Sequence, residues 1–347
     1  MNIAVYVSSP SKNPVSNFIV ETFFPLFNLI TRSRIWLITD TATEFALPVN
    51  CERIIVKSQP KNFLLKKIWI ERTLAGALKK IKADVFISAD SFCSLNLSLP
   101  QVVLMPDPDR IKLVHAKKAR LLIVTNEFAK KELIRKMKST EDKIVIVCPT
   151  PDVSSLQGVE APEAIKTKYS DGKEYFLYNG HFRKKENFFD LLKSFSHFKK
   201  RQQSNFKLLI IGNQNASWEK HTENYKYRAD VIIINSDNSR EKAAIVGAAY
   251  AVILPFNSDE DNTYALGAMQ SGVPVITTKS SSINEIAGDA VLCADQEVKD
   301  IGEKMMLLYK DENRRSQLIA KGRELVKIFT IERAASQFWQ SIMKGMN

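Results

Sequence analysis

Residues 175–212 read YFLYNGHFRKKENFFDLLKSFSHFKKRQQSNFKLLIIG, and this stretch decides the fold class. Its two ends, Tyr175–Tyr178 and Phe206–Ile211, are apolar almost without interruption, as expected of strands that helices cover on both faces. Between them, apolar residues recur with helical spacing over Phe188–Lys199. A strand, a helix and a second strand form a βαβ unit, so the stretch predicts a parallel sheet.

The same alternation of strands and helices extends in both directions along the chain. Seven strands are predicted in the first half: Asn2–Val7, Arg34–Thr39, Arg53–Lys57, Asp84–Ser88, Gln101–Met105, Leu121–Thr125 and Lys143–Val147. The helices predicted there are Val15–Ile30, Asn62–Ile81 and Glu127–Met137. After residue 212 the strands are Val231–Ile234, Ala251–Pro255 and Val273–Thr277, and the helices are Ser239–Ala249 and Tyr264–Gln270, with a helical tail from Val298. The chain is therefore predicted to be an α/β protein built from parallel sheets.

A length of 347 residues suits two domains of ordinary size. Two prolines, Pro149 and Pro151, open a polar stretch after which the strand pattern restarts at Tyr175. We therefore expect a first domain over 1–150, a linker over 151–173 and a second domain over 174–328. The last helical segment, 329–347, is expected to cross back onto the first domain.

The composition excludes several classes of protein. Hydrophobic residues make up 45% and charged residues 25% of the chain, as in ordinary globular proteins. No apolar run approaches the ~18 residues that a membrane-spanning helix requires. The first residues, MNIAVYVSS, are typical of a strand rather than a secretory signal. Because the four cysteines are far apart and lie in or beside apolar runs, we expect reduced thiols and a cytoplasmic protein.

The net charge of +12 is concentrated in the first half of the chain. Residues 1–150 hold 23 Lys/Arg and 13 Asp/Glu, a net charge of +10, whereas residues 151–347 hold 27 and 25, a net charge of +2. Two stretches, Asn62–Lys82 and Arg110–Lys143, carry most of this excess. They are either ordinary solvated helix surfaces or a surface for peripheral contact with the inner face of an anionic membrane. Without a recognition motif or interleaved aromatic residues, nucleic-acid binding is not expected.

Four sequence blocks in the second half occur in a specific order. They are residues 175–187, residues 208–212 (LLIIG), residues 248–276 (AAYAVILPFNS through to SGVPVI) and residues 281–290 (SSINEIAGDA). In order and spacing they resemble the C-terminal domain of the family-4 glycosyltransferases, over about 170 residues. The resemblance implies the GT-B fold, in which two Rossmann-like domains with doubly wound parallel sheets face each other across a cleft.

The resemblance also implies an activity. Such enzymes are hexosyltransferase-like and usually retaining. They move a sugar from a nucleotide-sugar donor, here a UDP- or GDP-sugar, to a glycan or lipid-linked acceptor in polysaccharide biosynthesis. Breaking the anomeric bond leaves negative charge on the nucleoside diphosphate, which preorganised donors must stabilise. Proteins of this type do so with basic side chains and a helix N-terminus, so no metal and no tightly bound cofactor is expected.

The resemblance implies catalytic roles for four residues. Arg183 and Lys185 would supply positive charge to the leaving diphosphate. Asp259 stands where the family has a glutamate that faces the donor sugar, and Asp107 stands where the family has an aspartate on the acceptor side. Seven further positions would bind the donor: Gly180, Lys184, Asn235, Ser236, Asn262, Thr263 and Glu285. Asn235 and Ser236 follow the third strand of the second domain, a usual place to read a nucleobase edge.

The chain departs from the family pattern at several of these positions. His181 and Glu186 stand where an arginine and a lysine are usual, and Pro106 replaces the histidine that precedes Asp107. Gly267 replaces a glutamate that holds the ribose hydroxyls. The active-site motifs are therefore degenerate, and a second function stays open: a glycosyltransferase-like protein that binds its ligand without turnover.

Overall fold

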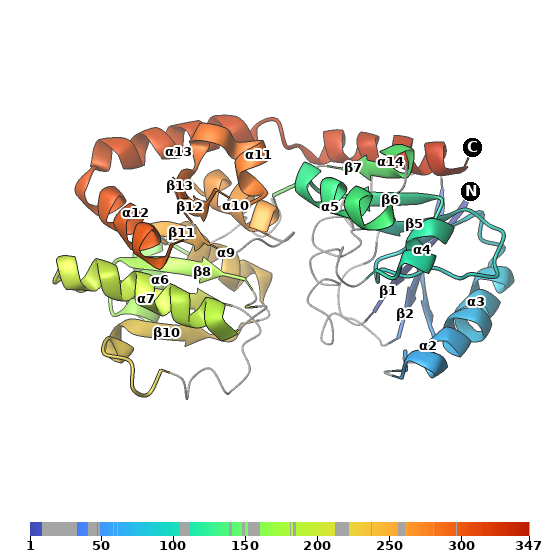
Figure 1. Cartoon of the computed structure of the whole chain (residues 1–347), viewed down its shortest axis with the longest axis horizontal. Helices are drawn as coiled ribbons and strands as arrows, with labels where there is room; N and C mark the ends of the chain where they lie inside the picture. The colour runs from blue at the N-terminus through green and yellow to red at the C-terminus, as the bar shows by residue number, and fades with distance from the viewer. Residues whose placement is uncertain are drawn as a thin grey trace. The chain divides into compact units, whose positions relative to one another are not determined.

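The computed structural model in Figure 1 describes most of the chain. The described residues are 1–8, 33–40, 47, 49–57, 59–60, 62–104, 111–138, 141–147, 150–151, 160–180, 182, 185–211, 222–236, 238–255, 261–279, 281–295 and 297–346. The helix predicted over Val15–Ile30 lies outside these residues.

The chain divides into two compact units. The first unit comprises residues 1–150 and 330–347, and the second comprises residues 151–329. Each unit is built on its own parallel sheet, in which the described residues form seven strands in the first unit and six in the second. The first unit is therefore made from two separate pieces of the chain.

The strands of the first unit are short, and all but the two edge strands are almost entirely buried. They are β1 (Asn2–Val7), β2 (Arg34–Thr39), β3 (Cys51–Ile55), β4 (Val85–Ser88), β5 (Gln101–Leu104), β6 (Leu121–Val124) and β7 (Ile144–Ile146). Their order is β3-β2-β1-β4-β5-β6-β7, and each described pair is parallel. Because β1 is flanked by β2 and β4, the order of strands reverses there, which is the doubly wound arrangement.

Alternate residues of each strand point to opposite faces of this sheet. Ile3 and Val5 lie in one apolar cluster with the last helix, α14 (Ile331–Met346), which contributes Phe338 and Ile342. Figure 1 shows α14 lying along the sheet of the first unit although it comes from the far end of the sequence. An amphipathic C-terminal helix thus completes one face of the N-terminal sheet.

The opposite face of this sheet carries the remaining described helices of the unit. Ala4 and Tyr6 of β1 pack with α2 (Phe63–Trp69) and α3 (Ala75–Lys80), which a π-helical turn, Ile70–Leu74, joins into one continuous helix. Two more helices, α4 (Leu113–Lys118) and α5 (Glu127–Met137), cover β5 and β6 on this side. Helices therefore cover both faces, as continuous apolar strands predict.

The second unit repeats the plan with six strands. They are β8 (Tyr175–Asn179), β9 (Lys207–Ile211), β10 (Val231–Ile234), β11 (Ala251–Leu254), β12 (Val275–Thr278) and β13 (Leu292–Ala294), in the order β10-β9-β8-β11-β12-β13. The described helices are α6 (Pro162–Ser170), α7 (Lys185–Arg201), α9 (Ser239–Gly247), α10 (Asp261–Gln270), α11 (Ile283–Ala287), α12 (Val298–Lys310) and α13 (Glu312–Val326). The reversal of strand order falls between β8 and β11.

The core of the second unit is rich in aromatic rings. Phe176 of β8 lies edge-on to Phe198 of α7 with ring centroids 5.0 Å apart, and 5.3 Å from Phe206. On the same side, Gly302 of α12 lets that helix approach α7 closely. A Cβ at this position would lie 2.8 Å from the carbonyl oxygen of Ser194, so a larger residue would push the two helices apart.

A short helix lies within the linker expected over 151–173. Residues 162–170 form α6, which begins with Pro162 in its first turn and ends where Asp171 takes a left-handed conformation. Ile165 is buried, and Tyr169 donates a hydrogen bond to Glu241 of α9. The segment is polar because most of this short helix faces solvent, which hid it in the sequence.

Other element boundaries differ by only a few residues. Strand β3 begins at Cys51 rather than Arg53, and the helical tail breaks at Asp311 as well as near Thr330. The short elements α4 and β13 were not predicted. No described helix is long and apolar enough to cross a membrane.

Candidate functional site

The carboxyl ends of β8 and β11 mark the place where ligands bind in doubly wound sheets. Strands β8 and β11 are neighbours in the sheet although they are not consecutive strands, and doubly wound folds bind ligands at the carboxyl ends of strands at such a switch point. The segments that follow β8, β11 and β12 all begin at this edge. They include Gly180, Asn262, Thr263 and Glu285, four of the residues predicted to bind a donor.

Gly180 directly follows β8 and is buried. Its N–H donates to the carbonyl oxygen of Ile211 at the end of β9, at 3.1 Å. A Cβ there would lie 3.2 Å from the hydroxyl oxygen of Tyr178, whose ring stacks on Phe182 at 4.4 Å. The close approach of this tyrosine gives a local reason for glycine at the strand end.

The first turn of α10 carries two buried polar side chains. Asn262 is fully buried and Thr263 is 8% exposed. Asn262 Oδ1 accepts a hydrogen bond from Ser282 Oγ at 3.2 Å. Asn262 Nδ2 and Thr263 Oγ1, however, have no hydrogen-bond partner among the described residues. Buried polar groups without partners are rare in folded proteins, and a ligand or an ordered water is the usual explanation.

The helix itself adds favourable electrostatics at this point. The N–H groups of its first turn have no partners within the helix, and the helix dipole places partial positive charge there. An anionic group such as a phosphate is stabilised in this position. The first turn of α10 therefore combines an anion-binding end with donors that lack a partner.

Ser282 ties this turn to the segment after β12. That segment contains α11, where Asn284 Nδ2 donates to the carbonyl oxygen of Thr278 and Asn284 Oδ1 accepts from Cys293 Sγ. Glu285 lies one residue further on and is exposed. The predicted donor-side glutamate is thus held at the same edge of the sheet as Asn262, through a network that sequence reasoning did not assign.

Asn235 and Ser236 follow β10, two strands away from β8. Ser236 Oγ donates to Glu241, which also accepts from Tyr169 and pairs with Lys168 at 3.2 Å. The hydrogen bonds from Ser236 and Tyr169, with the one from Lys168, lower the pKa of Glu241 to about 2. Ser236 is therefore part of a local polar network, whereas Asn235 is exposed.

Several predicted site residues fall outside the described part of the chain. They are Asp107, Arg183, Lys184 and Asp259, and of Lys185 only the backbone is described, as the first residue of α7. Their proposed roles stay predictions. Among the described residues, no group of three or more His, Cys, Asp or Glu side chains is placed to hold a metal ion.

The first unit has its own polar cluster at the carboxyl ends of β1 and β4. Ser8 Oγ donates to Asp90 Oδ1 at 3.0 Å, and the fully buried Tyr6 has no partner for its hydroxyl among the described residues. Burial, with the charges of Asp90 and Asp40, raises the pKa of Tyr6 above its usual range, so the phenol stays protonated. The sequence did not single out this cluster, because its members lie far apart in the chain.

Burial lowers the pKa of two further side chains of the first unit, Lys66 and His115. Burial lowers the pKa of Lys66, although Asp90 acts in the opposite direction, and its ammonium lies 4.8 Å from the centre of the Phe92 ring. His115 Nδ1 accepts from the N–H of Cys93 at 3.4 Å, and burial lowers its pKa, so the imidazole is neutral at pH 7. This hydrogen bond gives His115 a structural role.

Comparison with known proteins shows which family and which relatives this chain resembles. Residues 161–325 match the protein family described as "Glycosyl transferases group 1". The O-antigen chain mannosyltransferase B of Escherichia coli is 23% identical over 228 residues, which cover 63% of this chain and 59% of that protein. The chain thus aligns with less than two thirds of this relative's length.

Solved structures extend the comparison to almost the whole chain. A glycosyltransferase from Rickettsia africae ESF-5 superposes with a TM-score of 0.75 at 14% identity, covering 99% of this chain and 98% of that one. Anabaena Alr3699/HepE, solved in complex with UDP and glucose, gives a TM-score of 0.76 at 10% identity and 99% coverage of both chains. Residues 161–325 are thus similar to the glycosyl transferases group 1 family, and the chain has the two parallel Rossmann-like sheets of the GT-B fold.

Proposed function

We propose that this protein is a glycosyltransferase that moves a sugar from a nucleotide-sugar donor to a glycan or lipid-linked acceptor. The similarity of residues 161–325 to the glycosyl transferases group 1 family supports this function. The single observation that carries it for this chain is the first turn of α10, where Asn262 Nδ2 and Thr263 Oγ1 are buried without partners at the strand edge that receives ligands.

A diphosphate at this turn gives these groups partners. The N–H groups of the helix end and the Thr263 hydroxyl then stabilise the charge that grows on the leaving nucleoside diphosphate. Arg183, Lys184 and Lys185 add cationic donors from the loop after β8, and Asp259 and Glu285 face the donor sugar. Gly180, Asn235 and Ser236 line the nucleotide, and Asp107 serves the acceptor. A UDP-sugar is the first donor to test, because the Anabaena protein was solved with UDP.

Thr263→Val tests the proposal directly. The substitution keeps the shape of the side chain and removes a buried hydroxyl that has no described partner. We expect the free protein to unfold at the same or a higher temperature, because an unsatisfied buried hydroxyl costs about 1–3 kcal/mol. The affinity for a nucleotide sugar should fall about 2- to 10-fold, as for one lost hydrogen bond. Thermal shift with a panel of nucleotide sugars measures both effects, because a ligand that binds only the folded state raises its stability.

Thr277→Val is the matched control. Thr277 is buried in β12, and its Oγ1 donates to the carbonyl oxygen of Leu254 at 3.0 Å. This variant should lose stability and keep its affinity. The proposal fails if Thr263→Val behaves in the same way, or if no nucleotide sugar stabilises the wild-type protein. Stabilisation without release of nucleoside diphosphate, on addition of acceptor glycans, would favour the alternative of binding without turnover.

We also propose that the first unit makes peripheral contact with an anionic membrane that holds the acceptor. Two neighbouring helices expose five large apolar side chains: Leu64, Leu65 and Ile68 on α2, and Leu113 and Val114 on α4. Lys67, Lys112 and Lys117 are exposed on the same helices. We call these eight residues the α2/α4 patch. Exposed apolar side chains among lysines suit an interface of acyl chains and anionic headgroups.

Charge reversal at Lys67 and Lys112 should release the protein from anionic vesicles. Lys66 is spared because it is partly buried beside Asp90. Each basic residue near the surface contributes about 1 kcal/mol, so the double change to Glu should weaken binding roughly 30-fold or more at low salt. Sedimentation with phosphatidylglycerol vesicles measures this, and high salt should lower recovery of the wild type.

Lys79→Glu with Lys80→Glu is the control for this experiment. Both lysines are exposed on α3 and lie outside the α2/α4 patch. They should change recovery much less than Lys67 and Lys112. Equal recovery with neutral and anionic vesicles, or none with either, would contradict membrane contact through this patch.

A further inference from the structure

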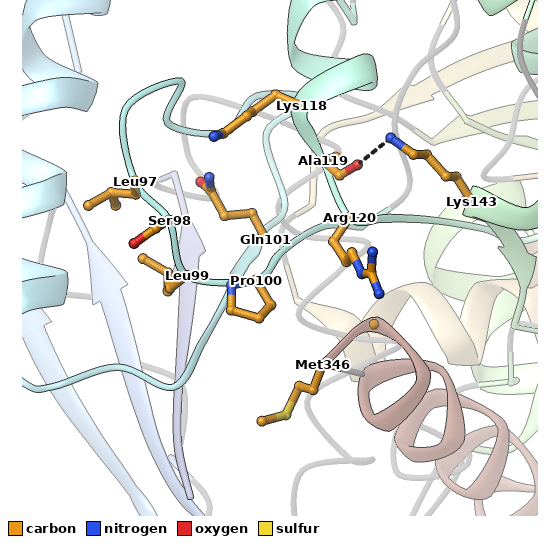
Figure 2. A pocket seen from close by; sticks show the side chains of 11 residues that line it. Leu97, Ser98, Leu99, Pro100, Gln101, Lys118, Ala119, Arg120, Lys143 and Met346 are labelled. Carbon is orange, nitrogen blue, oxygen red and sulfur yellow. Dashed lines mark hydrogen bonds between the residues drawn. The ribbon is translucent and has the colours of Figure 1, made fainter.

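A cavity of about 490 Å³ opens in the first unit, away from the strand ends described above. Figure 2 shows its walls, which come from the segment 97–101, from residues 118–120 and Lys143, and from Gly345 and Met346 at the end of α14. The volume lies within the range of pockets that hold small ligands.

The cavity lies at the amino ends of three neighbouring strands. Gln101 is the first residue of β5, Arg120 directly precedes β6, and Lys143 directly precedes β7. In a parallel sheet these ends share one edge, opposite the carboxyl edge where doubly wound folds bind their substrates. The cavity is therefore separate from the polar cluster of Tyr6, Ser8 and Asp90, and its occupant is not the acceptor group that reacts.

Its charge has a single sign. Lys118, Arg120 and Lys143 line the cavity, and none of the eleven lining residues is acidic. Lys118 and Arg120 are exposed and form no ion pair with a described residue. Three cations line one cavity, and a cavity lined by charges of one sign attracts an anion.

Lys143 is held in place by the end of α4. Its ammonium donates to the carbonyl oxygens of Lys117 at 2.9 Å and Ala119 at 3.4 Å, and Figure 2 shows the second bond. These carbonyls belong to the negative end of a helix, which on its own would disfavour an anion. Because Lys143 covers both of them, this part of the wall is cationic, and one N–H of the ammonium stays available.

The opposite wall is fixed and partly apolar. Gln101 accepts from the N–H of Ser94 and donates to the carbonyl oxygen of Ser94, both at 2.8 Å, which closes the loop that carries Leu97, Leu99 and Pro100. The nearby carboxylate of Glu71 is occupied by this loop, since it accepts from Ser94 Oγ at 2.6 Å and the N–H of Leu95 at 2.7 Å. These hydrogen bonds hold the loop that forms this wall, and Met346 adds apolar surface from α14.

We propose that this cavity binds a phosphate ester through Lys118, Arg120 and Lys143, with any apolar part of the ligand against Leu97, Leu99 and Met346. Arginine and lysine donate charge-assisted hydrogen bonds to phosphate oxygens, and arginine can do so with two N–H groups at once. A soluble phosphate ester and the headgroup of an anionic lipid share this chemistry. This proposal does not depend on the proposed transferase function, because no residue that lines the cavity belongs to the candidate donor or acceptor site.

Two monomeric probes separate the sources of the phosphate. Glycerol phosphate carries the charge alone, whereas dihexanoyl phosphatidic acid, used below its micelle concentration, adds short acyl chains. Titration calorimetry of the full chain at low salt should show saturable binding of at least one. Tighter binding of the lipid identifies a headgroup site that uses the apolar wall, and equal binding identifies a site for soluble esters. Both results support a phosphate site.

Two variants show whether binding occurs in this cavity. Arg120→Glu reverses one cation and should weaken binding at least about tenfold, as expected for loss of a charge-assisted hydrogen bond and gain of a repulsive charge. Ser98→Trp changes no charge, but it fills the cavity from an exposed position and should weaken binding by a similar factor. Lys80→Glu, on α3 outside the cavity, should have less than a twofold effect and reports on general electrostatic attraction.

Circular dichroism verifies that each variant is folded. Ser98→Trp provides a second test if Arg120→Glu perturbs the fold. Three outcomes overturn the proposal: no binding of either probe, unchanged affinity in both cavity variants, or an equal loss in Lys80→Glu.

Discussion

Replacing Lys184 and Lys185 together with alanine is expected to weaken nucleoside diphosphate binding by roughly 10²- to 10⁴-fold. Each charge-assisted hydrogen bond to a phosphate is worth about 1.5–3 kcal/mol, and two would be lost. Both residues follow Gly180 at the carboxyl end of β8, the strand next to β11, whose following helix carries Asn262 and Thr263. Calorimetric titration with UDP and GDP gives the loss and the preferred base together.

The control is the double variant Lys193→Ala/Lys200→Ala. Both lysines lie on α7, the helix that begins at Lys185. Lys193 is exposed and pairs with Asp190 at 3.0 Å, and Lys200 is exposed near the helix end. This pair removes the same charge at a distance from Gly180, so affinity should stay within about twofold. Equal losses of affinity in the two double variants would mean that only the net charge of the protein matters. Unchanged affinity in Lys184→Ala/Lys185→Ala would refute a role of this loop in binding the diphosphate.

Phe338→Ala is expected to destabilise the first unit by about 3–5 kcal/mol. Phe338 of α14 is fully buried in one cluster with Val102 of β5 and Leu121 of β6, and truncating a buried phenylalanine leaves a cavity that the surroundings fill only partly. Three of the four tryptophans, Trp36, Trp69 and Trp339, belong to the first unit. Tryptophan fluorescence in a urea titration therefore follows mainly this unit.

Met343→Ala provides the comparison, because Met343 lies on the same helix and is 40% exposed. It should shift stability by no more than about 0.5 kcal/mol, the usual range for surface changes. An unfolding midpoint for Phe338→Ala that matches Met343→Ala would mean that α14 contributes little to the first unit.

Local patterns predicted the strands well because their burial is nearly complete. A strand covered on both faces, such as β6 or β11, is apolar at every position, and this signal needs no information from the rest of the chain. Short exposed helices gave no such signal. In α4, Leu113 and Val114 face solvent, so helical periodicity was absent. In α6, Ile165 is the one buried apolar residue, which was too little to show an apolar face.

Family spacing predicted which residues belong to the candidate site, but it did not predict the contacts that these residues make. Family spacing led to Asn262 and Thr263, but their lack of hydrogen-bond partners depends on how α10 packs. The bonds from Ser282 to Asn262 and from Tyr169 to Glu241 join residues 20 and 72 positions apart. A single sequence does not reveal such pairs. The basic cavity is a similar case, because Lys118, Arg120 and Lys143 were visible only as members of a charged stretch.

The divided first unit has a consequence for how the protein is made. Residues 151–329 form the second unit as one uninterrupted piece and can complete their core before residue 330 has been synthesised. Until then the sheet formed by residues 1–150 lacks α14. The face of this sheet that Phe338 and Ile342 cover in the folded protein is therefore exposed to water. At about 5–20 residues per second, synthesis of the intervening 179 residues (329 − 150) takes roughly 9–36 s. During that interval the nascent N-terminal half is the part of the chain most in need of a chaperone, and a stop codon before α14 would damage the half that was translated first.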